Sequence, residues 1–347
     1  MSSDRLTPPD PDRDLQAYAR NRIESWEDPN EALTVGIYWT GSCGGCDATF
    51  VDLGETLLDL GEYIDIAIWP LATDFKRADL EALPEDGMDV CLFNGAIRED
   101  EHEAIAELVR DRSEVLVAFG ACAQLGGIPG LSDFEGAEHV TDTKYGDDRI
   151  AGGEPPRAET VVDSGTLSLP TLREHVDRLA DVVDVEYTVP GCPPSKRWTV
   201  EFLLSAIEGD LPPPGTIIAG DDHVCRECSR TIEERDLAAL DRVHETVPDE
   251  DCLLDQGVVC LGPLTRAGCG ARCPDVNVPC RGCYGVAEST GDVGAQLASS
   301  LGSLIEPREA DAVADLVADQ PDWAGLTHYF SLPDSSLRAF VRSDRNA

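Results

Sequence analysis

The cysteines of this sequence are the residues best suited to chemistry, and the first two are spaced as Cys-x2-Cys. Cys43 and Cys46 occur in "GSCGGCDATF", directly after an apolar run. A pair with this spacing is typical of a redox-active dithiol, of half a zinc site or of half an iron–sulfur site. The pair by itself leaves all three possibilities open.

Two further cysteines, Cys122 in "AFGACAQLGG" and Cys192 in "TVPGCPPSKRW", also follow apolar runs. If these runs are parallel strands, all four cysteines lie at the carboxyl ends of strands, where open α/β sheets bind ligands. Glycines flank the cysteines, so the backbone can approach a bulky group. A thioredoxin-like dithiol needs only the first pair, and the set of four therefore favours a metal centre.

The second half supplies eight more cysteines, enough for two further four-thiolate centres. They are Cys225, Cys228, Cys252, Cys260, Cys269, Cys273, Cys280 and Cys283. Zinc ribbons use two regular Cys-x2-Cys pairs, and the single cysteines at the middle of this set break that pattern. The remaining cysteine, Cys91, lies inside an apolar run, and we interpret it as a buried structural residue.

Short apolar runs rich in β-branched residues predict the strands that must position these cysteines. The runs cover residues 33–39, 63–69, 89–97, 114–120 and 185–189. Helical patterns such as 99–111 alternate with them, which predicts a mostly parallel, doubly wound α/β sheet. The segment 128–169 is rich in Gly, Pro and Asp, and we interpret it as a long surface insertion.

We expect four regions along the chain. They are a polar N-terminal extension (1–30), an α/β domain (31–212), an irregular cysteine-rich domain (213–290) and a C-terminal helical extension (291–347). The second boundary rests on the turn-forming sequence "PPPG" that follows Leu211.

The chain is strongly acidic, with 67 Asp and Glu against 27 Lys and Arg and a formal net charge of −40. The acids are scattered, so in dilute buffer the surface repels itself. At about 1 M salt the Debye length falls to roughly 3 Å and this repulsion is screened. We therefore interpret the protein as one from the high-salt cytoplasm of a halophile, and we expect no nucleic-acid binding.

No membrane span and no signal peptide are expected. No stretch approaches the roughly 18 apolar residues that a spanning helix needs, and the N-terminus is polar and Pro-rich. We expect a cytoplasmic protein, in which 13 cysteines favour metal binding over disulfides. Dinucleotide-binding, P-loop, nucleophile-elbow and zinc-protease motifs are absent from the sequence, so neither nicotinamide binding nor hydrolysis is expected.

Four stretches resemble the small subunit of NiFe hydrogenases: "GSCGGCDATF", "GACAQLGG", "VPGCPPS" and "CLGPLTRAGCGARCPDVNVPCRGCYG". The resemblance is closest to the soluble cytoplasmic group that includes the methyl-viologen-reducing and sulfhydrogenase types. It implies a flavodoxin-like domain that holds a proximal 4Fe–4S cluster, followed by a cysteine-rich domain that holds medial and distal clusters.

The resemblance also assigns twelve cysteines to three 4Fe–4S clusters. The proximal set is Cys43, Cys46, Cys122 and Cys192; the medial set is Cys269, Cys273, Cys280 and Cys283; the distal set is Cys225, Cys228, Cys252 and Cys260. In membrane-bound and periplasmic members a histidine stands at the position of Cys225, and the medial site lacks a counterpart of Cys273. Ser42 stands just before the first proximal cysteine, where the family commonly has an acidic residue. We do not expect His223 to be a cluster ligand.

By this resemblance the chain is the electron-transfer subunit of an oxidoreductase, a cytoplasmic NiFe hydrogenase. Electrons from dihydrogen oxidation in a separate NiFe large subunit would pass through the three clusters to a downstream acceptor subunit or protein. Two alternatives stay open: a quinone-reductase-type iron–sulfur subunit related to complex I, and a zinc-binding interaction protein. Quinone-reductase-type subunits carry an adjacent Cys-Cys pair instead of the spaced Cys43 and Cys46, and they lack the eight later cysteines.

Seven arginines lie among the later cysteines, which is unusual in so acidic a chain. They are Arg226, Arg230, Arg235, Arg242, Arg266, Arg272 and Arg281. They either pair with neighbouring acids or offset the negative charge of clusters, and the sequence leaves both interpretations open.

The acidic composition predicts a salt-dependent fold. Self-repulsion at a net charge of −40 is screened only when the Debye length is short, so we expect the melting temperature to fall steeply below about 1 M salt. Thermal unfolding at a series of NaCl concentrations measures this. A melting temperature that is equal in low and molar salt would contradict the halophilic interpretation.

Overall fold

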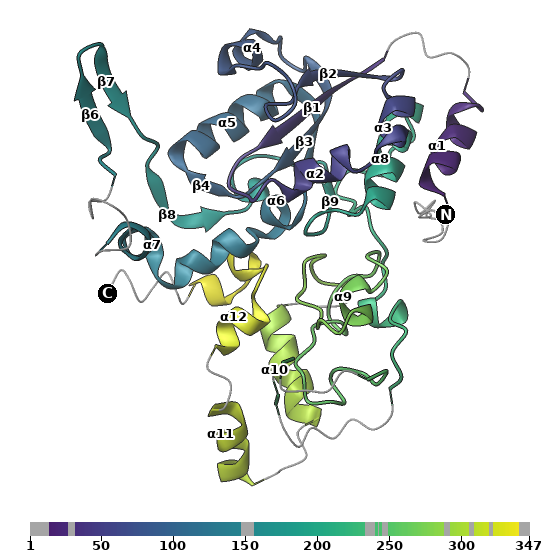
Figure 1. Cartoon of the computed structure of the whole chain (residues 1–347), viewed down its shortest axis with the longest axis vertical. Coiled ribbons are helices and arrows are strands. Elements are labelled where there is room, and N and C mark those ends of the chain that lie inside the picture. Colours follow the sequence, from purple (N-terminus) through teal and green to yellow (C-terminus); the bar gives the residue numbers. More distant parts are fainter. Residues whose placement is uncertain are drawn as a thin grey trace.

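The computed structural model describes residues 14–26, 32–146, 156–232, 240–241, 243–244, 249–287, 292–304, 309–318 and 322–339. Its main element is a five-stranded parallel sheet with the strand order β2–β1–β3–β5–β9 (Figure 1). The strands are β1 (Leu33–Trp39), β2 (Ile64–Ile68), β3 (Met88–Asn94), β5 (Ser113–Phe119) and β9 (Tyr187–Val189). Counted along the chain, this is the 2-1-3-4-5 order of flavodoxin-like folds, and the predicted fold class is confirmed.

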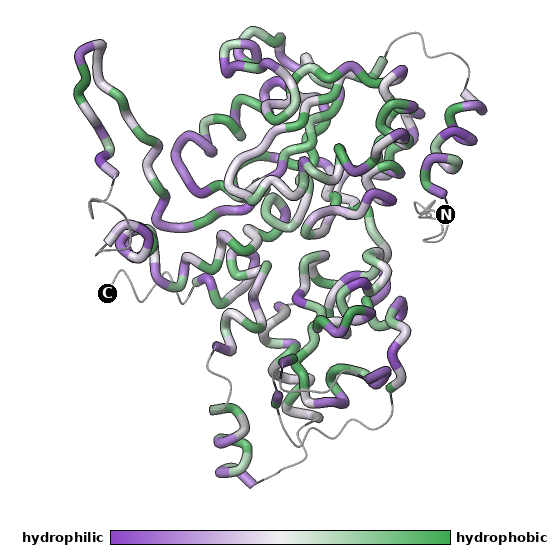
Figure 2. Tube along the Cα trace, viewed as in Figure 1, coloured by the Kyte–Doolittle hydropathy of each residue, from purple (hydrophilic) through white to green (hydrophobic). Residues whose placement is uncertain are grey.

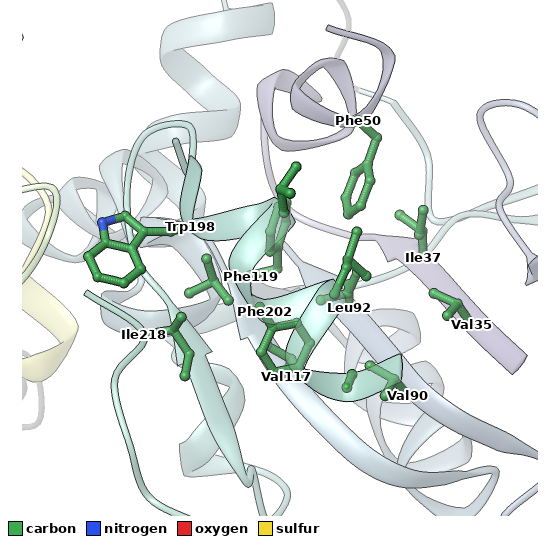
Figure 3. Close-up of a cluster of buried hydrophobic side chains, with 14 of the residues drawn as sticks. Val35, Ile37, Phe50, Val90, Leu92, Val117, Phe119, Trp198, Phe202 and Ile218 are labelled. Carbon is green, nitrogen blue, oxygen red and sulfur yellow. The ribbon is translucent and has the colours of Figure 1, made fainter. Parts of the chain in front are cut away.

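The side chains of the central strands alternate between two apolar cores, because successive residues of a strand point to opposite faces. Val90 and Leu92 of β3 belong to one core, whereas Cys91 and Phe93 belong to the other. Both faces of the sheet are therefore buried, which explains why its strands are continuous apolar runs in the sequence. Figure 3 shows the first core, in which Trp198 lies beside the strand residues.

Helices cover both faces of the sheet. Residues of α1 (Leu15–Ile23), α2 (Gly45–Val51), α3 (Glu55–Leu60) and α8 (Lys196–Glu208) pack in the first core, and residues of α4 (Arg77–Ala82), α5 (Asp100–Asp111) and α6 (Ala121–Leu125) pack in the second. The longest of them, α8, begins where the Ser195 hydroxyl accepts the Trp198 N–H at 3.4 Å. It ends at Gly209, whose φ of +68° is the left-handed C-cap that glycine favours.

The structure contains all five predicted strands, but the predicted C-terminal end of the strand over 89–97 is wrong. β3 stops at Asn94, and the next residues form β4 (Ile97–Glu99), which pairs antiparallel with β8 (Leu172–Asp177) in a separate sheet. Gly95 makes the break with a φ of +108°, and a Cβ at this position would lie 2.5 Å from the Thr40 hydroxyl. Only glycine fits such a turn.

The predicted surface insertion over 128–169 is only partly correct. The 3₁₀ helix η1 (Ile128–Phe134) packs inward, and its buried Asp133 accepts the Val176 N–H at 2.9 Å. Helix α7 (Gly136–Tyr145) follows. The hairpin of β6 (Glu159–Val162) and β7 (Gly165–Ser168) is exposed along its whole length and projects from the molecule (Figure 1). The prediction is right for the hairpin and wrong for η1.

The described residues between 213 and 287 have little regular structure, as predicted. They contain η4 (Val224–Arg226), α9 (Arg272–Asp275) and isolated bridges. Apolar residues recur along this irregular stretch (Figure 2), and many of them form a separate core with residues of α10 (Val293–Leu304). Ile217 forms a β-bridge with Thr188 of β9, so the region begins in contact with the sheet. The predicted domain bounds stay predictions.

The C-terminal segment, residues 328–338, returns to the sheet domain after α11 (Ala310–Ala318) and α12 (Trp323–Thr327). Its 3₁₀ helix η5 (Leu332–Asp334) lies against α6 and η1, where a Cβ on Gly126 or Gly130 would collide with Pro333. Two ion pairs hold the segment to residues next to η3 (Leu179–Asp181): Arg178 with Asp334, and Arg338 with Asp177.

The same C-terminal segment also contacts the cysteine-rich region. Phe330 packs with Ala121 and Leu125 of α6 and with Cys283. One aromatic side chain therefore lies between two parts of the chain that both carry candidate ligands. No helix in the described parts of the chain has the length and apolar character needed to cross a membrane.

The burial of Cys91 predicts a pH effect on stability. Burial raises the pKa of this thiol from 9.0 to about 12. Because the folded-state pKa is the higher one, the neutral thiol contributes stability below pH 9, and this contribution is lost as the pH rises toward 12. In denaturant titrations at these pH values, the free energy of unfolding should fall more steeply for the wild type than for Cys91→Ala. Parallel curves for the two proteins would contradict a buried neutral thiol.

Candidate metal centres

The four cysteines of the first half lie where parallel strands end. Cys43 and Cys46 follow β1, Cys122 lies in α6 directly after β5, and Cys192 follows β9. As predicted, all four come to the carboxyl edge of the sheet, which is the ligand-binding edge of this fold.

These four thiols are close enough to act on one another's ionisation. Burial raises the pKa of Cys46, and the thiols of Cys122, Cys192 and Cys43 raise it further. Burial also raises the pKa of Cys122 to about 12, with Cys192 and Cys43 adding to the effect. Four thiolates can share this place only when positive charge balances them, and a metal centre supplies that charge.

Glycines allow the backbone to pass close to two of these sulfur atoms. A Cβ on Gly120 would lie 2.5 Å from Cys46 Sγ, and a Cβ on Gly127 would lie 2.6 Å from Cys122 Sγ. Both glycines also have left-handed φ angles, of +92° and +60°. Any side chain here would push a sulfur atom aside, so these positions require glycine.

A buried carboxylate beside the first pair was missed by the sequence analysis. Asp47 is 1% exposed and accepts hydrogen bonds from Trp69 Nε1 at 2.9 Å and Asn94 Nδ2 at 3.0 Å. Asn94 in turn accepts the Ser42 hydroxyl at 3.2 Å. The network ties both flanks of the Cys43 and Cys46 loop to the ends of β2 and β3. The only signal in the sequence was an Asp after the second cysteine.

A second set of four cysteines lines one cavity in the cysteine-rich region. They are Cys225, Cys228, Cys252 and Cys260. Gly262 forms part of its wall, and a Cβ there would lie 3.2 Å from Cys225 Sγ and 3.5 Å from Cys260 Sγ. The cavity lining includes Cys225 and not His223, and the choice of Cys225 as the ligand stays a prediction.

The third set lies between the other two. Burial raises the pKa of Cys280 to about 12, and the thiols of Cys260 and Cys269 add to this rise. The pKa of Cys283 lies well above its usual value, again first because of burial and then because of Cys280, Cys269 and Cys192. Burial raises the pKa of Cys269 too, and the exposed Cys273 is among the groups that act on it.

Direct contacts connect the three sets. The backbone N–H of Cys280 donates to Cys260 Sγ at 3.2 Å, which joins the third set to the cavity. On the other side, the thiols of Cys283 and Cys273 both lie within electrostatic reach of Cys192. The predicted proximal, medial and distal sets therefore form a continuous series in space, although their roles as ligands stay predictions.

The described residues contain no group of three His, Cys, Asp or Glu side chains arranged to hold one metal ion. An iron–sulfur cluster requires a different arrangement, because its cysteine ligands bind separate iron atoms of a larger group.

A protein-family profile described as NADH ubiquinone oxidoreductase, 20 Kd subunit, matches residues 43–206. This range contains the four cysteines at the edge of the sheet and ends before the eight later cysteines. The profile therefore matches most of the sheet domain and none of the cysteine-rich region.

Known relatives align with most of the chain. The iron–sulfur subunit of the F420-non-reducing hydrogenase of Archaeoglobus profundus is 34% identical over 320 residues, which cover 88% of this chain and 98% of that protein. A vhu subunit of the F420-non-reducing hydrogenase of Methanocaldococcus jannaschii is 35% identical over 308 residues, covering 88% and 97%. The delta subunit of sulfhydrogenase 2 from Pyrococcus furiosus is 28% identical over 253 residues, covering 73% and 86%. The chain therefore belongs to the family of the iron–sulfur subunits of F420-non-reducing hydrogenases.

Proposed function

We propose that this chain is the electron-transfer subunit of a NiFe hydrogenase and that it holds three 4Fe–4S clusters. The observation that carries the proposal is the arrangement of twelve cysteines in three neighbouring sets of four. Cys43, Cys46, Cys122 and Cys192 would hold the proximal cluster, Cys269, Cys273, Cys280 and Cys283 the medial one, and Cys225, Cys228, Cys252 and Cys260 the distal one. When bound, these clusters would supply one-electron transfer.

The chain's own residues prepare these places for negatively charged clusters. Burial keeps the free thiols protonated, so binding must release protons as the ligands become thiolates. The hydrogen bond from the Cys280 N–H to Cys260 Sγ is of the kind that stabilises charge on a ligating sulfur. Apolar residues such as Leu253 and Leu254 line the distal cavity, so its walls are partly apolar.

The carboxyl edge of the sheet is the surface on which we propose that a NiFe large subunit binds. Cys43, Cys192 and Cys273 are exposed, and the large apolar side chains of Trp39 and Ile128 are exposed nearby. A partner that covers this edge would exclude solvent from the proximal cluster and bury these side chains. The catalytic site would then belong to the partner, and a further subunit or protein would accept the electrons.

The complex-I-type alternative has support from the family profile but does not explain the second half of the chain. That profile ends at residue 206, whereas eight of the twelve clustered cysteines follow it. The spaced pair Cys43 and Cys46 also differs from the adjacent pair of such subunits. We therefore favour the hydrogenase function, in a high-salt cytoplasm as the net charge of −40 indicates.

Metal analysis tests the number and kind of clusters. Protein purified anaerobically should contain about twelve iron and twelve sulfide per chain. Cys228→Ala should lower both by about four, because it removes a thiolate from the distal cavity. Cys91→Ala is the matched control and should leave both unchanged, because Cys91 lies in a core of the sheet domain.

Two results would contradict the proposal. Stoichiometric zinc without iron would support a zinc-binding interaction protein instead. About four iron per chain, unaffected by Cys228→Ala, would leave only the sheet-edge centre and favour the complex-I-type alternative.

Assembly with the large subunit tests the proposed interface. Ile128 is 44% exposed, and its backbone N–H donates to the Cys122 sulfur, so it marks the surface of the proximal site. Ile128→Glu should abolish co-purification of a large subunit by burying a charge in the interface. Leu58→Glu is the control: Leu58 is 74% exposed on α3, which leads to the opposite end of the sheet. Equal recovery of the large subunit with both variants would contradict this interface.

A further inference from the structure

Arg281 occupies an unusual place between two candidate ligands of the medial cluster, Cys280 and Cys283. Its Nη1 atom is buried and has no hydrogen-bond partner. Within the described part of the chain, no carboxylate forms an ion pair with Arg281. Guanidinium groups stay protonated in proteins, so among the described residues this is a partly buried positive charge without a carboxylate counter-ion.

The ionisable groups that act on the Arg281 charge are the thiols of Cys260 and Cys280 and the hydroxyl of Tyr329. Cys280 belongs to the medial set and Cys260 to the distal set, and these two residues are joined by the hydrogen bond at 3.2 Å. The guanidinium therefore lies where the two sets meet. Tyr329, from the C-terminal segment, is also close enough to act on this charge.

The other described arginines of this region have different surroundings. Arg226 is 77% exposed and pairs with Asp222 at 3.2 Å, and Arg266 pairs with Asp221 at 3.4 Å. Arg230 also lines the distal cavity, but its guanidinium donates to the backbone oxygens of Asp249, Asp251 and Pro274. Arg272 is exposed in α9. Arg235 and Arg242 lie outside the described residues. These neighbours account for Arg226, Arg230 and Arg266 without any cluster, whereas Arg281 has no negative partner among the residues that the structure describes.

We propose that Arg281 is the fixed counter-cation shared by the medial and distal clusters and that it raises the reduction potentials of both. The inference rests on the proposed function, because the clusters are its negative partner. Reduction adds one electron and one negative charge to a cluster, and a nearby buried cation stabilises that added charge. Arg281 thereby favours electrons on the medial and distal clusters over electrons on the proximal one.

Redox titration of the anaerobically purified complex, followed by electron paramagnetic resonance, tests this role. Arg281→Gln should make reduction of the medial and distal clusters at least tenfold less favourable, which is about 59 mV for one electron. Arg281→Lys keeps the charge and should restore most of the difference. Arg226→Gln removes the same formal charge beside Cys225 but at an exposed position, and it should change neither potential by this amount. The proximal cluster serves as the internal reference.

Each outcome discriminates between the two proposals. Unchanged potentials in Arg281→Gln at full iron content would overturn the role of Arg281 and leave the three clusters in place. If Arg281→Gln loses a cluster and Arg281→Lys keeps it, the result would support the need for a positive charge at this position. If both variants lose the cluster, the proposed role of the charge would be overturned. A wild-type protein without three clusters would overturn the proposed function instead.

Discussion

The close approach of buried thiols is the constraint on which the rest of this structure depends. Burial and neighbouring thiols disfavour the thiolates of Cys46 and Cys280, so the fold must hold these cysteines at places where the sulfur atoms repel each other once ionised. In the sheet domain a rigid parallel sheet does this, helped by the network around Asp47. In the cysteine-rich region Cys260 and Cys280 are themselves part of the apolar core. There, binding a cluster and completing the core are the same event, since the ligands are also the packing residues.

The sequence was informative wherever a local pattern determines the structure. Continuous apolar runs predicted the five strands because both faces of the sheet are buried, and the positions of four cysteines after those runs placed them at one edge. Features that depend on distant partners could not be predicted. The break at Gly95 requires Thr40, the burial of η1 involves Val176, and Asp47 is explained only by Trp69 and Asn94. The same holds for Arg281, whose surroundings come from three separate loops.

The charges of this protein operate in two different regimes. Most of its acidic residues lie at the surface, where molar salt reduces their interactions to a few ångströms. A partly buried charge such as that of Arg281 is screened much less, so it keeps more of its strength in molar salt. A protein adapted to high salt can therefore still use individual buried charges to adjust the energy of an electron, although surface charges have lost that ability.

The C-terminal segment has a consequence for biosynthesis. Phe330 and Pro333 pack against α6 and the loop of Cys283, yet they leave the ribosome after every cysteine has been made. Until these residues have been translated, the surface between the proximal and medial sites lacks its last layer. The packing of Phe330 against α6 and Cys283 thus forms only after both cysteine-bearing parts of the chain are present. The order of residues along the chain therefore leaves this surface open until the C-terminal segment arrives.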